Sequence, residues 1–231
     1  MLNFKGILRS SLIDYPGQIT AVLFLPKCNF RCPFCHNPEL SLFSEKGEDI
    51  SEELILSFLD DRKGKLDAIT ITGGEPTLSE GLLEFVKKVK DKGFLVKLDS
   101  NGTRPEVLEE LIPYVDFIAM DIKSSLESYE RNCGVKVDLE KIKRSVELIK
   151  NSGNDYEFRT TLVRSLTTEE DIKKICSWLK GSKRYVLQQF DKRNLIINED
   201  LKSEVIYTKE EMENFKIICS EAFEEVDIRG Y

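Results

Sequence analysis

The sequence predicts an α/β fold, a partial TIM-like (β/α)6 barrel, and three observations lead to it. Short runs of β-branched and aromatic residues alternate with helical patterns, which is typical of βα units around a parallel sheet. Six such repeats follow one another without a clear linker. The chain of 231 residues suits one large domain with a substantial core. We therefore expect a single domain over residues 1–231, with its core at about 18–190 and a C-terminal extension at 191–231.

Each predicted strand is a short apolar run of strand length. The six strands are placed at Ile19–Leu25, Ala68–Thr72, Phe94–Asp99, Phe117–Asp121, Glu157–Val163 and Tyr185–Phe190. Helices are predicted where apolar residues recur at helical spacing. They are placed after Ser51 and at Glu80–Asp91, Pro105–Leu111, Leu139–Lys150, Thr168–Lys180 and Lys209–Phe223.

The first of these helices has a clear start. Ser51 is a suitable N-cap, and Glu52 and Glu53 place negative charge in the first turn, where the helix dipole favours it. Its predicted apolar face consists of Leu54, Ile55, Phe58 and Leu59. Among the cysteines outside the N-terminal region, Cys176 and Cys219 are expected in the core on apolar helix faces, and Cys133 in a loop.

Composition and charge argue against several classes of protein. The net charge of −7, spread through a chain that is 32% charged, provides no basic footprint for nucleic acid. The longest apolar stretches, such as Ala21–Pro26, have strand length, and the first residues lack the apolar region of a signal peptide. We expect a cytoplasmic protein that acts on a protein or a small molecule, without binding nucleic acid or a membrane.

Cys28, Cys32 and Cys35 form a CxxxCxxC triplet, and the next cysteine is Cys133. A cubane cluster has four irons, so three thiolates on one short loop would leave one iron free to bind a substrate. A zinc site needs a fourth ligand, and His36 lies directly beside Cys35, where chelation of the same ion is poor. Three cysteines cannot all pair locally as disulfides. The spacing favours an open iron-sulfur cluster, with zinc and plain thiols as alternatives.

Polar motifs follow the first four predicted strands. They are the cysteine loop, Thr72–Pro76, Asp99–Gly102 and Met120–Lys123. The carboxyl ends of parallel strands form one active face, so these motifs are expected at one mouth. Gly73 and Gly74 allow close approach of a backbone to a ligand, and Glu75 with adjacent carbonyls suits an ammonium group. Each motif alone fits a tight turn or a solvated charge, but four together favour a site.

The cysteine triplet, with an aromatic residue before its last cysteine, and Gly73–Pro76 resemble the radical S-adenosylmethionine superfamily. Within it the chain resembles the glycyl-radical-enzyme activases, and most closely the longer form of anaerobic ribonucleoside-triphosphate reductase activating protein. The resemblance covers most of the chain, from Gly6 to about Phe190. The closer match is carried by Ser11–Gly17, Cys35–Leu40, Glu157–Thr161 and Leu187–Phe190.

This resemblance implies a [4Fe-4S] cluster, S-adenosylmethionine and a monovalent cation as cofactors. Cys28, Cys32 and Cys35 would ligate three irons, and the cofactor's amino and carboxylate groups would chelate the fourth. Phe34 would lie near the adenine, and Gly73, Gly74 and Glu75 would receive the methionyl ammonium. Asp99, Ser100 and Asp121 would surround the cation. Lys123 and Arg159 would contact the cofactor's carboxylate or ribose. No catalytic residue is implied beyond cluster and cofactor, and Asp14 is expected near the substrate glycine loop.

The implied activity is reductive cleavage of S-adenosylmethionine to methionine and a 5'-deoxyadenosyl radical, which abstracts hydrogen from a glycine α-carbon of a partner enzyme. The resemblance implies two partners. One is a glycyl radical enzyme, namely anaerobic ribonucleotide reductase, and the other is a flavodoxin- or ferredoxin-like electron donor. A barrel of six units leaves a lateral opening through which a partner's loop can reach the cofactor. The sequence leaves the identity of the glycyl radical enzyme, the donor, the oligomeric state and the role of Cys133 open.

Departures from the family's pattern leave alternatives. The interval His36–Thr72 contains no cysteine, so no second cluster is expected there. The pyruvate formate-lyase type of activase has a histidine near the sixth strand, where this sequence has Gln188 and Gln189. One alternative is an activase of that type. A second is a radical enzyme that acts on a small molecule such as a deazaguanine precursor, with residues 191–231 closing the mouth of the barrel. A third is a zinc-binding interaction module in which His36 or Cys133 completes the ligands of the triplet.

Overall fold

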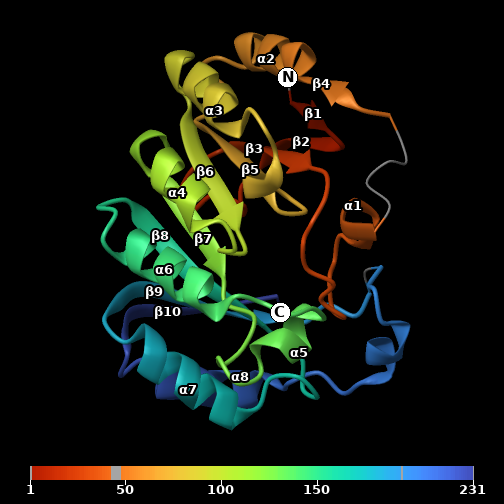
Figure 1. The fold of residues 1–231 in the computed structure, drawn as a ribbon, viewed down its shortest axis with the longest axis vertical. Helices are drawn as coiled ribbons and strands as arrows, with labels where there is room; N and C mark the ends of the chain where they lie inside the picture. Colours follow the sequence, from red (N-terminus) through yellow and green to blue (C-terminus); the bar gives the residue numbers. More distant parts are fainter. Residues whose placement is uncertain (1, 43–47, 194, 231) are drawn as a thin grey trace.

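An open, curved sheet of eight strands organises the computed structural model, which describes residues 2–42, 48–193 and 195–230 (Figure 1). The strands are β2 (Gly6–Ser11), β3 (Thr20–Leu25), β5 (Ala68–Gly73), β6 (Leu95–Ser100), β7 (Phe117–Asp121), β8 (Asp155–Leu162), β9 (Ser182–Gln189) and β10 (Phe223–Arg229). They lie side by side in the order β10-β9-β8-β7-β6-β5-β3-β2. All neighbours are parallel except β2, which runs antiparallel to β3. The two edge strands, β2 and β10, do not pair with each other, so the predicted partial barrel is confirmed.

The six predicted strands are all present, and two edge strands were missed. In β2, three consecutive residues are exposed, so its sequence shows no apolar run. In β10, acidic residues interrupt the apolar ones, in a segment that resembles the end of a helix. The predicted helix Lys209–Phe223 in fact ends at Cys219, and Phe223 opens β10, where its ring stacks on Tyr185 with centroids 4.6 Å apart.

Helices connect the parallel strands, and Figure 1 shows α3, α4, α6 and α7 along the outer side of the sheet. The helices are α1 (Pro38–Leu42), α2 (Glu52–Asp61), α3 (Leu82–Asp91), α4 (Pro105–Leu111), α5 (Tyr129–Cys133), α6 (Leu139–Lys150), α7 (Glu169–Leu179) and α8 (Lys209–Cys219). Short 3-10 turns are η1 (Pro76–Leu78), η2 (Ile112–Tyr114) and η3 (Glu199–Ser203), and β1 (Asn3–Phe4) pairs with β4 (Ile50–Ser51). No helix in the described ranges has the length and apolar character needed to cross a membrane.

Side-chain caps explain why several helices begin where the sequence indicates. The predicted N-cap Ser51 accepts a hydrogen bond from the Leu54 amide, and Asp138 accepts two from the first turn of α6. Thr168 and Thr208 form complete capping boxes at α7 and α8. Such caps pair amide groups that the helix itself leaves without a partner.

The buried face of α2 is narrower than the sequence suggests. Ile55 and Leu59 are fully buried and Phe58 is partly buried, but Leu54 is 63% exposed. Ile55 and Leu59 are four residues apart and therefore share one side of the helix, while Leu54 is turned about 100° from Ile55. The prediction for Leu54 was wrong, because this helix packs through a stripe rather than a broad face.

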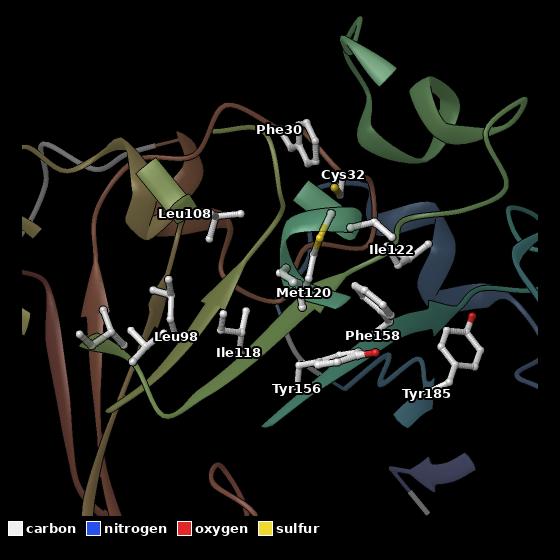
Figure 2. Close-up of a cluster of buried hydrophobic side chains, with 14 of the residues drawn as sticks. Phe30, Cys32, Leu98, Leu108, Ile118, Met120, Ile122, Tyr156, Phe158 and Tyr185 are labelled. Atoms are coloured by element: carbon white, nitrogen blue, oxygen red, sulfur yellow. The ribbon is translucent and has the colours of Figure 1, made fainter. Parts of the chain in front are cut away.

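The main core lies between the sheet and its helices. Figure 2 shows Leu98, Ile118, Met120 and Phe158 from three neighbouring strands packed in this layer. Cys176 on α7 and Cys219 on α8 are buried there, with their Sγ atoms 3.3 Å apart, which confirms them as core residues.

Cys133 differs from its prediction, because it is the last residue of α5 rather than part of a loop. It is fully buried. Its carbonyl oxygen accepts a hydrogen bond of 2.8 Å from the Arg31 amide, so α5 contacts the cysteine loop directly.

Truncation of Leu59 to alanine is expected to lower the free energy of unfolding by about 2–5 kcal/mol, because it opens a cavity under α2. Leu54→Ala is the matched control on the same helix, and its effect should stay within about 0.5 kcal/mol. Urea denaturation followed by circular dichroism measures both variants. Equal losses would show that Leu54 also packs in the core.

Candidate functional site: a cofactor cavity at the strand ends

A cavity of about 300 Å³ opens at the carboxyl ends of the parallel strands. Every residue that the sequence placed at the cofactor lines it, namely Cys28, Cys32, Phe34, Cys35, Gly73, Gly74, Glu75, Asp99, Ser100, Asp121, Lys123 and Arg159. Asp14 and Gln188 also line it. The fold therefore brings the four predicted motifs to one mouth, although it does not by itself assign their roles.

The cysteine loop leaves β3 and is held by backbone contacts on both sides. The Lys27 amide donates to the Leu40 carbonyl at 2.9 Å, and the Cys35 amide donates to the Cys32 carbonyl at 3.0 Å. The Arg31 guanidinium donates at 2.7 Å to the carbonyls of Cys28 and Phe30. These contacts hold the loop in place through the protein's own groups.

Gly73 and Gly74 allow the end of β5 to lie directly against this loop. The Gly74 amide donates to the Leu25 carbonyl at 2.9 Å, and the Glu75 amide donates to the Lys27 carbonyl at 2.7 Å. A Cβ atom on Gly74 would stand 1.9 Å from the Lys27 carbonyl oxygen, which is backbone and cannot yield easily. Gly73 has a φ of 121°, which other residues rarely adopt. Glycine is therefore required here for backbone packing as well as for ligand access.

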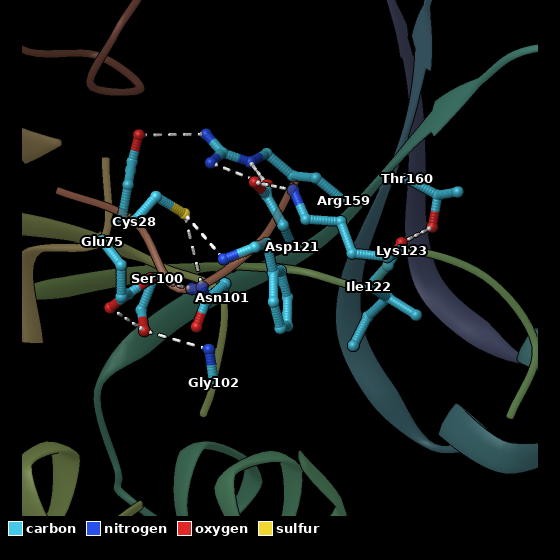
Figure 3. A network of polar contacts seen from close by, with 12 residues as sticks. Cys28, Glu75, Ser100, Asn101, Gly102, Asp121, Ile122, Lys123, Arg159 and Thr160 are labelled. Carbon is cyan, nitrogen blue, oxygen red and sulfur yellow. Dashed lines mark hydrogen bonds and ion pairs between the residues drawn. The ribbon is translucent and has the colours of Figure 1, made fainter. Parts of the chain in front are cut away.

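Glu75 joins the loops that follow β5 and β6 (Figure 3). Its Oε1 accepts from the Thr77 amide at 3.1 Å, the Thr77 hydroxyl at 2.5 Å and the Ser100 hydroxyl at 2.9 Å. Its Oε2 accepts from the Asn101 amide at 2.6 Å. Burial raises the pKa of Glu75 above its usual value, although these hydrogen bonds act in the opposite direction. All the donors are neutral groups, so a cationic ligand would be the first charge to meet this carboxylate.

Two carboxylates and two cations form the floor of the cavity, and Figure 3 shows three of them, Asp121, Lys123 and Arg159. Asp121 contacts the Arg159 guanidinium and the Lys123 ammonium, each at 2.9 Å, and Arg159 also reaches Asp99 at 3.3 Å. Burial alone would raise the pKa of Asp121, but Arg159 and Lys123 hold it below its usual value. The pKa of Asp99 is lowered in the same way by Arg159 and Lys97, against the effect of burial. Both groups therefore remain carboxylates well below neutral pH.

Sequence reasoning missed Lys97 and Arg229 as members of this network. The Lys97 ammonium pairs with Asp99, and its side chain is 2% exposed. Arg229 binds both oxygens of the fully buried Glu157, at 2.8 and 2.7 Å. Lys97 and Asp99 are two residues apart on one strand and therefore share a face, so the sequence alone could have indicated their pairing. Arg229 lies on β10, which was not predicted.

Asn101 is another residue that the sequence did not assign. Its Nδ2 donates to the Asn29 side chain at 2.8 Å and lies 4.0 Å from the Cys28 Sγ. Its Oδ1 accepts from the Thr103 amide and hydroxyl at 3.1 and 2.8 Å. This side chain links the loop after β6 to the cysteine loop.

The three thiols differ in their surroundings. Burial raises the pKa of Cys28 to about 12 and also raises that of Cys35. A hydrogen bond with Cys133 is the main cause that lowers the pKa of Cys32 to about 7. Iron ligates thiolates, and its binding displaces their protons, so a raised pKa does not prevent a buried thiol from serving as a ligand.

The donor set fits a cluster with one open iron. Cys28, Cys32 and Cys35 are the cysteines that line the cavity within the part of the chain that the structure describes. In that same part, no three His, Cys, Asp or Glu side chains converge on a single metal ion, whereas in a cubane cluster each thiolate ligates a different iron. The three thiols share their cavity with carboxylates, cations and the glycine strip, which leaves room for a second, polar ligand at the remaining iron.

Comparison with known proteins identifies the family of this chain. Residues 22–179 match the model of the Radical SAM superfamily, so the chain belongs to that superfamily. A protein of Methanocaldococcus jannaschii, provisionally named a glycyl-radical enzyme activating enzyme, is 36% identical over 97% of this chain and 95% of its own length. The pyruvate formate-lyase-activating enzyme of Clostridium pasteurianum is 30% identical over 78% of this chain and 77% of its own. Within the superfamily, the chain is thus a radical enzyme of the glycyl-radical-enzyme activating group.

A solved structure supports the fold. A domain of the pyruvate-formate lyase-activating enzyme from Bacteroides vulgatus superposes with a TM-score of 0.56 at 20% identity, covering 71% of this chain and 99% of that domain. Membership of the superfamily implies a [4Fe-4S] cluster and S-adenosylmethionine as cofactors. When bound, the two groups supply an organic radical, and the protein's own residues hold and shield them.

Substitution of Gly74 by alanine is expected to displace the cysteine loop, because the new Cβ meets the Lys27 carbonyl oxygen. After anaerobic reconstitution, we expect iron content of the variant to fall by about half or more, since three thiolates must meet one cluster. Gly6→Ala is the control, because a Cβ there would lie 3.5 Å from Phe24, an ordinary contact. Full iron loading of the Gly74 variant would show that the loop tolerates the shift.

Arg159→Met should lower the unfolding free energy of the cluster-free protein by about 3 kcal/mol at pH 7, because it leaves two partly buried carboxylates, Asp99 and Asp121, without the cation that they share. Groups whose pKa is lowered in the folded state stabilise it above their unfolded pKa, and that stabilisation is lost as pH falls through the folded pKa. The difference between parent and variant should therefore shrink below about pH 4, where the variant's carboxyls take up protons.

Urea denaturation at several pH values measures this difference. Arg104→Met, which removes an exposed ion pair with Glu106, serves as the control and should show no comparable change. A deficit for Arg159→Met that stays constant from pH 7 to pH 3 would contradict the role of the two carboxylates.

Proposed function

We propose that this chain activates an anaerobic ribonucleoside-triphosphate reductase in the cytoplasm by installing a glycyl radical on it. The proposal rests on which segments of the chain line the cavity. The segments Ser11–Gly17, Cys35–Leu40, Glu157–Thr161 and Leu187–Phe190, on which the closer resemblance rests, each contribute to it, for example through Asp14, Asn37, Arg159 and Gln188.

The proposed roles of the residues follow from their positions. Cys28, Cys32 and Cys35 would hold the cluster, and Phe34 would lie beside the adenine. Gly73, Gly74 and Glu75 would receive the methionyl ammonium, because the hydrogen-bond donors to Glu75 among the described residues are all neutral. Lys123 and Arg159 would face the cofactor's carboxylate. Such fixed contacts orient the cofactor and exclude water from it.

The surroundings of the cavity favour a macromolecular substrate. Leu12 and Ile13, next to the cavity residue Asp14, are 75% and 84% exposed. Adjacent exposed apolar side chains at the mouth of a site suit contact with another protein. The sheet is open between β2 and β10, so a loop of a partner has a lateral route to the cavity. An electron donor of the flavodoxin or ferredoxin type would complete the system.

The test is anaerobic incubation of the reconstituted, reduced protein with S-adenosylmethionine and each candidate partner. We expect an organic radical signal by electron paramagnetic resonance on anaerobic ribonucleotide reductase, together with 5'-deoxyadenosine, and neither product from Cys32→Ala. At limiting partner concentration, Ile13→Ser should slow radical formation by about tenfold, whereas Ile217→Ser, on the exposed side of α8, should not.

The outcomes separate the alternatives. A radical on pyruvate formate-lyase instead of the reductase would assign the chain to the pyruvate formate-lyase type. Multiple turnovers of S-adenosylmethionine with a small molecule such as a deazaguanine precursor, and no partner protein, would contradict an activase function altogether.

A further inference from the structure

The position expected for a monovalent cation already carries positive side chains of the protein itself. Asp99 pairs with the Lys97 ammonium and with Arg159, while Asp121 pairs with Arg159 and Lys123. The third expected cation ligand, Ser100, donates its hydroxyl to Glu75 at 2.9 Å and accepts from the Gly102 amide at 3.1 Å. The set that would surround a cation is thus engaged in other contacts.

The side chain of Lys97 is held in a fixed position by the fold. It lies on β6 between Val96 and Leu98, both fully buried, and its side chain points to the same side of the strand as Asp99. Its ammonium also lies 5.9 Å from the centre of the Phe117 ring, which favours a positive charge there. A buried lysine of this kind places a compact charge at a constant position.

The charges of the network leave one positive charge in excess. Three carboxylates, Asp99, Asp121 and Glu157, are in ion-pair contact with Lys97, Lys123, Arg159 and Arg229 among the described residues. The carboxylate of S-adenosylmethionine carries one negative charge. This carboxylate would therefore balance the network without any added ion, while the cofactor's ammonium group is assigned to Glu75, outside the network.

We propose that the Lys97 ammonium takes the place of the monovalent cation, so that this protein binds S-adenosylmethionine without bound Na⁺ or K⁺. The inference rests on the cofactor placement proposed above, and it holds whichever partner enzyme is activated. It assigns Lys97 as a positioning residue that acts through Asp99.

Isothermal titration of S-adenosylmethionine into the reconstituted protein tests this directly. The buffers hold choline, Na⁺ or K⁺ as the only monovalent cation, at equal ionic strength. For the parent protein we expect dissociation constants that agree within about twofold among the three buffers. Lys97→Met, which removes the charge from a side chain of similar length, should bind about tenfold more weakly in choline and recover in K⁺ or Na⁺.

Two controls keep the result interpretable. Lys63→Met removes an exposed lysine that pairs with Asp60, and it should behave like the parent in every buffer. Should Lys97→Met fail to fold, the parent's own dependence on the cation decides the question, together with anomalous scattering from crystals soaked in Rb⁺.

Two different results would contradict the role of Lys97 and the placement of the cofactor. Parent affinity that rises about fivefold or more with K⁺ or Na⁺, or Rb⁺ bound between Asp99 and Asp121, would overturn the role of Lys97 alone. An absence of S-adenosylmethionine binding in all three buffers would overturn the cofactor placement, and this inference with it.

Discussion

Carboxylates on the inner side of the sheet need cationic partners, because an unpaired buried charge costs several kcal/mol. Arg159 on β8 meets this need for its neighbours, since it contacts Asp121 on β7 and Asp99 on β6. Arg229 pairs with Glu157 from the other side, on β10. Each pair joins different strands, so the same contacts that neutralise the charges also constrain the register of the sheet and the shape of the cavity floor.

The opposite wall of the cavity depends on backbone contact instead of charge. The end of β5 and the cysteine loop approach so closely that a side chain on Gly74 would not fit between them. Glu75 and Asn101 then connect this pair of loops to the loop after β6. A cofactor at the cysteines would therefore lie between a closely packed wall that carries Glu75 and a floor of paired charges, which suits a molecule with both an adenosine part and an amino-acid part.

Much of this was predictable, because motifs at the carboxyl ends of parallel strands meet at one edge. The triplet from Cys28 and the motifs beginning at Gly73, Asp99 and Asp121 could be placed without knowing any side-chain contact. What escaped prediction depends on pairing across the sheet. Arg229 needs an edge strand whose acidic residues hid it, whereas Lys97 shares a strand face with Asp99 and could have been assigned from the sequence. Asn101 needed the position of a loop distant in sequence.

The order of the strands has a consequence for how the chain is made. From β3 onward, every strand lies beside the one that precedes it in the sheet, so a strand leaving the ribosome meets an edge that is already formed. Glu157 enters the sheet with β8, yet its guanidinium partner arrives only with β10. Without β10, the ion-pair contact that remains to Glu157 among the described residues is Arg159, at 4.0 Å. β10, which follows the other strands of this sheet in the sequence, thus completes the charge pairing next to the cavity, so the cavity floor depends on a strand that docks after its neighbours.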